Sequence, residues 1–147
     1  DKMVIESVSL MEEIVSAAPS QPPEIGGILG GTNQVVSLYV LDKGIAGGAM
    51  CSYTPDVMQL NHQIQRWAED RIEFMGMFHV HFGGAATLSP GDRRYIVKIM
   101  EAMPPQIKWL YFPVVVMPKR EMVVYKAERG DGKITITQDE IEYQGGF

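Results

Sequence analysis

The sequence predicts a mixed α/β domain in which helices cover a β-sheet. Three stretches carry apolar residues at steps of three and four, which is the spacing of amphipathic helices. Between them lie short runs rich in β-branched and aromatic residues, bounded by glycine and proline. The predicted order is helix, strands, helix, strand, helix, strands, with no internal repeat and no linker. This order indicates one domain built of a sheet and helices around a shared core.

The first predicted helix covers residues 4–18. Its apolar residues recur at helical spacing, at Val4, Val8, Met11, Val15 and Ala18. The prolines that follow end the helix and favour an extended backbone; they are Pro19, Pro22 and Pro23. Glu24 therefore lies at the exit of a stiff, proline-rich link.

Two strands are predicted after this link, followed by a third whose sequence pattern is weaker. Residues 25–30 form a buried apolar run whose glycines allow another backbone or a ligand to approach closely. A turn at residues 31–33 connects this run to residues 34–41, so that the two strands are expected to pair as a hairpin. Residues 45–53 carry the weaker pattern of the third strand.

A second helix is predicted to begin at Thr54-Pro55-Asp56. In this reading Thr54 is the N-cap, Pro55 occupies the first helical position and Asp56 lies in the first turn. The apolar side of the helix consists of Val57, Leu60, Ile64, Trp67 and Ala68. His62 lies off this side, and we interpret it as a surface residue.

The next apolar run, residues 74–82, is short enough for a buried strand and contains two of the three histidines, His79 and His81. Side chains at i and i+2 of a strand point to the same face, so the two imidazoles are expected to project side by side. Two neighbouring imidazoles form the start of a zinc site, to which a carboxylate can add a third ligand.

A third helix is predicted to begin just after this strand, with Ser89 as N-cap and Pro90 at the first position. Asp92 then falls in the first turn, from which its carboxylate can reach back toward the histidines. Ser89 and Asp92 also fit an ordinary capping box, so the pair by itself is consistent with a purely structural role. Pro104 and Pro105 end the helix.

Three further strands are predicted in the C-terminal part, over residues 109–117, 121–127 and 133–137. The first two are separated by a turn at residues 118–120 and are expected to pair. Pro113 lies inside the first of them and predicts an edge strand or a bulge, because proline cannot donate a backbone hydrogen bond.

Composition limits the classes of function. Of the 147 residues 46% are hydrophobic and 21% are charged, as in ordinary globular domains, and the net charge is −5. Lysine and arginine form no basic stripe, so nucleic acid is not expected as a partner. No apolar run is long enough to span a membrane, and Glu6, Glu12 and Glu13 interrupt the N-terminal pattern, so neither a membrane nor a signal peptide is expected. Cys51 is the single cysteine, which favours a reducing compartment and a cytoplasmic location.

Taken together, five residues carry a family resemblance. The pattern His79-x-His81, seven residues, Ser89-x-x-Asp92, with Glu24 upstream of a glycine-rich strand, resembles the signature of the JAMM (MPN-plus) metalloproteases. The resemblance covers about residues 24–126 of a single domain, 1–147. It implies the fold of that family, a curved mixed β-sheet flanked by helices and similar to cytidine deaminases.

The resemblance also implies a mechanism. His79, His81 and Asp92 would hold a catalytic Zn²⁺ that keeps an open fourth position. Glu24 would act as general base, and Ser89 would stabilise the oxyanion. The reaction would be that of a metallopeptidase or isopeptidase, which cleaves an amide bond after the C-terminal tail of a ubiquitin-like or sulfur-carrier protein. The short turns indicate a compact, prokaryote-like member of the family.

The glycines of the two motifs allow two interpretations. Gly26, Gly27, Gly83 and Gly84 leave narrow space, which suits an extended substrate ending in Gly-Gly. Alternatively, they serve only turns and close strand packing.

Other classes of protein remain as alternatives. Phe82 stands where the family usually has proline, which puts the path of the loop and substrate access in question. RadC-like proteins share the histidine, serine and aspartate spacing, but they carry His-Pro-Ser-Gly where this chain has His81, Phe82, Gly83 and Gly84. A non-catalytic MPN scaffold usually lacks one or more ligands, and here all are present. A zinc deaminase would need Pro-Cys-x-x-Cys, which is absent. The oligomeric state is not predicted.

Overall fold

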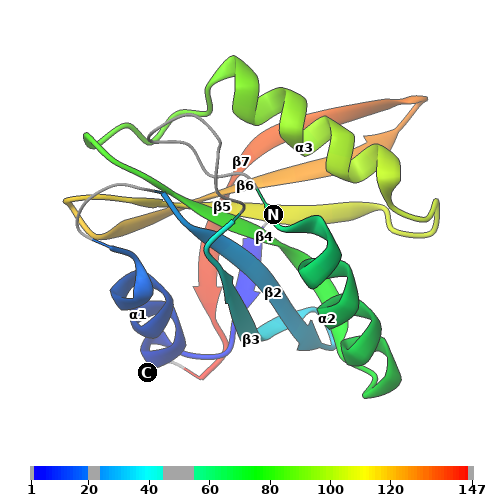
Figure 1. The fold of residues 1–147 in the computed structure, drawn as a ribbon, viewed down its shortest axis with the longest axis horizontal. Coiled ribbons are helices and arrows are strands. Elements are labelled where there is room, and N and C mark those ends of the chain that lie inside the picture. The colour runs from blue at the N-terminus through cyan, green and yellow to red at the C-terminus, as the bar shows by residue number, and fades with distance from the viewer. Residues whose placement is uncertain (1, 20–23, 45–54, 146–147) are drawn as a thin grey trace.

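The computed structural model describes residues 2–19, 24–44 and 55–145. Within them, the strands form one closed barrel in the order β1-β3-β2-β4-β5-β6-β7, and three helices accompany it (Figure 1). The strands are β1 (Lys2–Ile5), β2 (Gly26–Thr32), β3 (Val35–Asp42), β4 (Glu73–His81), β5 (Trp109–Val116), β6 (Glu121–Gly130) and β7 (Lys133–Tyr143). The helices are α1 (Val8–Ala17), α2 (Val57–Glu69) and α3 (Pro90–Ala102).

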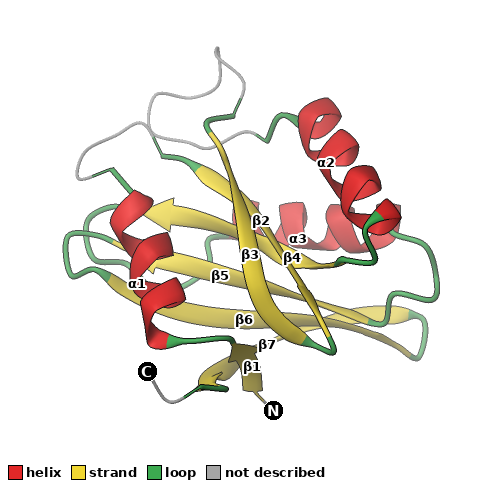
Figure 2. Cartoon of the chain, turned by 90° about the horizontal axis from the view of Figure 1, so that it is seen from below, coloured by secondary structure: helices red, strands yellow, loops and turns green. Residues whose placement is uncertain are grey.

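The predicted fold class, a curved mixed sheet flanked by helices and similar to cytidine deaminases, is wrong, because the sheet closes. Closure depends on β1, which pairs in parallel with β3 on one side and with β7 on the other (Figure 2). Its residues Met3 and Ile5 are fully buried. The sequence pattern assigned β1 to the first helix, because the four-residue spacing of Val4 and Val8 fits a helix. In the structure Val4 belongs to β1, and Val8 begins α1. The helix begins instead after Ser7, whose hydroxyl accepts a hydrogen bond from the Leu10 N–H at 3.1 Å.

The apolar residues form two clusters that lie on opposite faces of the barrel strands. The first contains Phe78 and Val80 of β4 together with Ile14 of α1. The second contains Met77 of β4 together with apolar residues of α2 and α3, among them Trp67. Because neighbouring residues of a strand alternate between faces, the side chains of β4 that follow Met77 at steps of two point toward the side of α2 and α3.

The helices differ from the prediction mainly at their ends. In α2 the N-cap is Asp56, whose carboxylate accepts a hydrogen bond from the Gln59 N–H at 3.2 Å, and not Thr54, which lies outside the described residues. The predicted strand at residues 45–53 and Cys51 also lie outside them. Of the helices in the described ranges, none is long and apolar enough to cross a membrane.

Pro113 does not mark an edge, because β5 lies between β4 and β6. The antiparallel pairing with β6 continues through Pro113, which faces Val124. On the other side, β4 and β5 pair at Gly76↔Tyr111 and next at His79↔Val114, so the ladder is interrupted beside the proline. This interruption accommodates the missing N–H within the barrel.

Candidate metal centre

The pairing of β2 with β4 places Glu24 beside the histidines. Gly26 of β2 lies opposite His79, and the Val80 N–H donates a hydrogen bond to the Ile25 carbonyl at 3.0 Å. Glu24 comes one residue before Ile25, so it lies at the end of the barrel where β4 ends. Its side chain is partly exposed and lines the same cleft as both imidazoles.

The two imidazoles lie side by side on the face of β4 that also carries Met77. His79 is buried and His81 is partly exposed. Their Nε2 atoms are 2.8 Å apart, and the ring planes are inclined at 69°. The predicted same-face arrangement is therefore present, and both Nε2 atoms point to one place.

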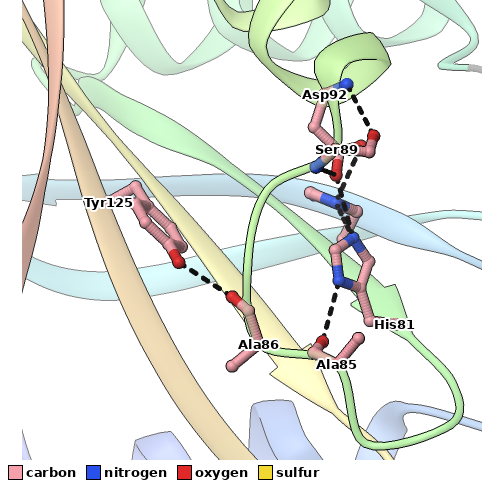
Figure 3. Close-up of polar contacts among 7 residues, drawn as sticks. His81, Ala85, Ala86, Ser89, Asp92 and Tyr125 are labelled. Carbon is pink, nitrogen blue, oxygen red and sulfur yellow. Dashed lines mark hydrogen bonds and ion pairs between the residues drawn. The ribbon is translucent and has the colours of Figure 1, made fainter.

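The first turn of α3 brings a carboxylate to that place. Asp92 Oδ1 is 3.5 Å from His79 Nε2, and Asp92 Oδ2 is 3.2 Å from His81 Nε2. The predicted capping box is also present: Asp92 Oδ2 accepts from the Ser89 N–H at 2.9 Å, and Ser89 Oγ accepts from the Asp92 N–H at 3.0 Å (Figure 3). The structural and the functional interpretations of this pair are thus compatible, since the cap holds the carboxylate against the histidines.

The distances between these side chains fit a metal ion. Ligand atoms that surround a zinc ion tetrahedrally lie about 3.3 Å from one another. Asp92 approaches the two histidines with a different oxygen each, at separations near this value, and the Nε2 atoms are about half an ångström closer to one another. One ligand atom from each of the three residues lies within 4.8 Å of the others, so small rotations of the side chains can bring them around one ion. His79, His81 and Asp92 are thus a group that could hold a metal ion.

The orientation of His81 also suits a ligand. Its Nδ1 lies 3.1 Å from the Ala85 carbonyl oxygen (Figure 3). A carbonyl oxygen only accepts, so Nδ1 carries the proton and donates it. In the neutral ring Nε2 then carries the free lone pair. A metal ion that binds at Nε2 requires this tautomer.

The charges in the site follow from the same contacts. Burial disfavours the ionised form of Asp92, but hydrogen bonds from His79, His81 and the Ser89 N–H outweigh it and hold the pKa of the carboxyl group well below its usual range. The hydrogen bond with Asp92 raises the pKa of His81, against the lowering effect of burial. Asp92 is consequently a carboxylate at neutral pH.

The cleft has a volume of about 670 Å³. All five residues of the sequence motif line it, together with Phe82, Ala85, Thr87, Gly91 and Tyr95. His62 is exposed on α2 and is not among them, in agreement with its interpretation as a surface residue.

Tyr95 of α3 also lines the cleft, although it is not part of the sequence motif. Its hydroxyl donates to Met77 Sδ at 3.3 Å, and burial, followed by the charges of Asp42 and Asp92, raises its pKa, so that the phenol stays neutral. The sequence contains one indication that Tyr95 lies in the cleft: it follows Asp92 by three residues, and residues at this spacing lie on the same side of a helix.

The motif glycines do not all serve the cleft. A Cβ atom on Gly27 would lie 2.3 Å from the Val40 carbonyl oxygen and 2.8 Å from the ring of Phe78. Gly27 thus permits close packing, as in the second interpretation. Gly83 and Gly84 have φ values of +81° and +78°, which favour glycine in the turn after β4.

Comparisons with known proteins show similarity at the level of the fold. No protein-family model matches the sequence, and no curated protein matches it. Among solved structures, protein DSY2949 from Desulfitobacterium hafniense superimposes with a TM-score of 0.62 at 16% identity, over 97% of this chain and 94% of the other. AF2198, a JAB1/MPN domain protein from Archaeoglobus fulgidus, superimposes with a TM-score of 0.54 at 17% identity, over 97% of this chain and 99% of the other. The fold is therefore MPN-like.

Proposed function

We propose that the protein is a zinc-dependent hydrolase of the JAMM type that cleaves amide bonds. One observation carries this proposal: the side chains of His79, His81 and Asp92 converge in a cleft that also contains Glu24 and Ser89. Two imidazoles and a carboxylate form the ligand set of many catalytic zinc sites, in which a fourth position stays open. When bound, a zinc ion acts as a Lewis acid and lowers the pKa of water toward about 7.

Glu24 is proposed as the general base. It lines the cleft from the end of the barrel where β4 ends, and its charge contributes to the raised pKa of His81, which places it within electrostatic reach of the histidines. From there its carboxylate takes a proton from the attacking water and delivers it to the nitrogen of the leaving amine.

Ser89 is proposed to stabilise the oxyanion. Its Oγ accepts the hydrogen bond from the Asp92 N–H, and its own hydroxyl proton remains available to a second acceptor. Ser89 is exposed to the cleft, so this proton can be donated to the carbonyl oxygen of a bound substrate as negative charge develops on it.

The proposed substrate is the extended C-terminal tail of a ubiquitin-like or sulfur-carrier protein. β3 pairs with β1 only at Val35 and Val36, and no other described strand pairs with the outer edge of β3 from Ser37 to Asp42. Leu38 and Leu41 on this stretch are more than one-third exposed. An extended peptide can add to such an edge through backbone hydrogen bonds.

Such a tail can also reach the metal centre. The edge of β3 continues to the level of Asp42, which faces Gly26, and Gly26 in turn faces His79. Neighbouring strands are about 4.8 Å apart, so a peptide on this edge lies about 14 Å from β4. About four extended residues span that distance. This geometry favours substrates with a long, unfolded tail over compact ones.

Hydrolysis of tail fusions tests the proposal. Fusions of a ubiquitin-like protein that end in Gly-Gly followed by a reporter would be incubated with the zinc-loaded protein. We expect release of the reporter that stops when a chelator is added. If zinc is bound and no fusion releases the reporter, the proposed activity is contradicted, and a non-catalytic scaffold remains as the alternative function. Release that is unaffected by replacing Gly-Gly with bulky residues would contradict the proposed substrate and indicate a general peptidase.

A further inference from the structure

The loop between the metal-centre strand and α3 is anchored from a distant strand. Tyr125 of β6 donates its hydroxyl hydrogen to the Ala86 carbonyl oxygen at 2.8 Å, across 39 positions of the sequence (Figure 3). The tyrosine is 7% exposed. It faces Phe112 of β5 on one side and Gln138 of β7 on the other, so it lies where β6 is paired on both sides.

The anchored carbonyl is next to the one that orients His81. The Ala85 carbonyl accepts the Nδ1 proton of His81, and the Ala86 carbonyl accepts the hydroxyl proton of Tyr125. These two carbonyls belong to consecutive planar peptide units. Only the φ and ψ angles of Ala86 lie between them, so fixing one carbonyl restricts the direction of the other.

The loop is held on the other side of Ala85 as well. The Gly84 N–H donates to the Met117 carbonyl at 2.9 Å, and Met117 in turn donates its N–H to the His81 carbonyl at 2.8 Å. The Gly84 contact restrains the backbone before Ala85, and the Tyr125 contact restrains the backbone after it. The Ala85 carbonyl is consequently held between two anchors.

We propose that Tyr125 is a positioning residue of the metal centre, which acts through the Ala85–Ala86 backbone to keep the imidazole of His81 in its orientation, with its Nδ1–H donated to the Ala85 carbonyl. Metal ligands depend on such outer contacts, and their loss typically weakens metal binding 10- to 100-fold. The effect on zinc affinity rests on the proposed function. The effect on the His81 ring does not, because the hydrogen bonds that produce it are present without a metal ion.

The test compares Tyr125→Phe with a matched control, Tyr111→Phe. Tyr111 is also 7% exposed, and its hydroxyl also donates to a backbone carbonyl, that of Lys2 at 3.1 Å. Each substitution removes one hydroxyl group from the barrel, but the hydroxyl of Tyr111 is bonded to β1, whereas that of Tyr125 is bonded to the loop after β4. Thermal unfolding of both variants shows that each is folded before the comparison is made.

The first measurement uses the metal-free protein. The chain has three histidines, so nitrogen–proton NMR spectra of the imidazoles are readily assigned with the help of His62→Ala. We expect Nδ1 of His81 in the parent protein to carry a slowly exchanging proton, and in Tyr125→Phe several-fold faster exchange of this proton. Parent-like spectra of Tyr125→Phe, or equal changes in Tyr111→Phe, would overturn the proposal.

The second measurement is the zinc dissociation constant, obtained by competition with a chelator. We expect it to rise about tenfold in Tyr125→Phe and to stay within about twofold of the parent in Tyr111→Phe. An unchanged affinity of Tyr125→Phe would overturn the positioning role in metal binding. A parent protein that binds no zinc would instead contradict the proposed function, and the comparison of Nδ1 proton exchange would still decide the role of Tyr125 in holding His81.

Discussion

Gly26 of β2 lies directly opposite His79 of β4 in an antiparallel pair. This single register position explains how two distant motifs share a site. Residues before Gly26 and residues after His79 run off the same end of the barrel, so Glu24 and His81 meet there although 57 positions (81 − 24) separate them. The start of α3 then adds Ser89 and Asp92 to the same end.

Zinc should stabilise the protein, and His81 should be required for this effect. At a free zinc concentration of 100 times the dissociation constant, the unfolding free energy rises by about 2.7 kcal/mol. We expect this stabilisation in thermal unfolding of the parent and of His62→Ala, in which an exposed histidine is removed. His81→Ala should show little or none of it. Full stabilisation of His81→Ala would rule out His81 as a ligand.

Glu24→Gln should separate binding from catalysis. The amide cannot take up a proton at neutral pH, so hydrolysis of a tail fusion should fall about a hundredfold or more, whereas zinc content should stay at about one ion per chain. Glu73→Gln, at the opposite end of β4, is the control and should change neither quantity. Loss of zinc together with activity would show that Glu24 is a ligand or a structural residue and not the base.

Ser89 should show two separable roles. Ser89→Ala removes the N-cap of α3 and should lower the unfolding free energy by about 1 kcal/mol. It also removes the proposed oxyanion donor, so the rate should fall by about a hundredfold. Ser89→Thr keeps a hydroxyl for both roles and should retain most of the stability and rate. If Ser89→Ala loses stability but keeps the parental rate, Ser89 is a cap only.

Gly76 should be essential for the barrel. A Cβ atom at Gly76 would lie 1.8 Å from the Tyr111 carbonyl oxygen, and its φ of +155° disfavours other residues. Gly76→Ala should therefore cost about 3 kcal/mol or more in urea unfolding. Gly130→Ala, where no atom lies within 4 Å of the new methyl group, should cost less than about 1 kcal/mol. Similar stabilities of the two variants would contradict the close pairing of β4 with β5.

The sequence predicted those parts of the site that depend on local geometry. The side-by-side arrangement of His79 and His81 follows from the period of two along a strand, and the cap formed by Ser89 follows from helix-start chemistry. Both depend on residues within three positions of each other. The strand boundaries of β4 and β5 were predicted to within one residue for the same reason.

The parts that the sequence did not reveal depend on distant pairing. The four residues of β1 carry too little pattern to be distinguished from the helix that follows, and their partners in β3 and β7 are 31 and more positions away. The hydrogen bond from Tyr125 to Ala86 is likewise set by the closed barrel and not by a local motif. The closure of the barrel and the contact of Tyr125 with the loop beside the metal centre therefore follow only from the three-dimensional structure.

The most direct test of the metal centre is a crystal structure of the protein grown with zinc, with anomalous diffraction recorded on both sides of the zinc absorption edge. The site described above predicts one strong anomalous peak per chain, in contact with His79, His81 and Asp92. A peak bound by other residues, or no peak at a zinc concentration that saturates the protein in solution, would contradict it.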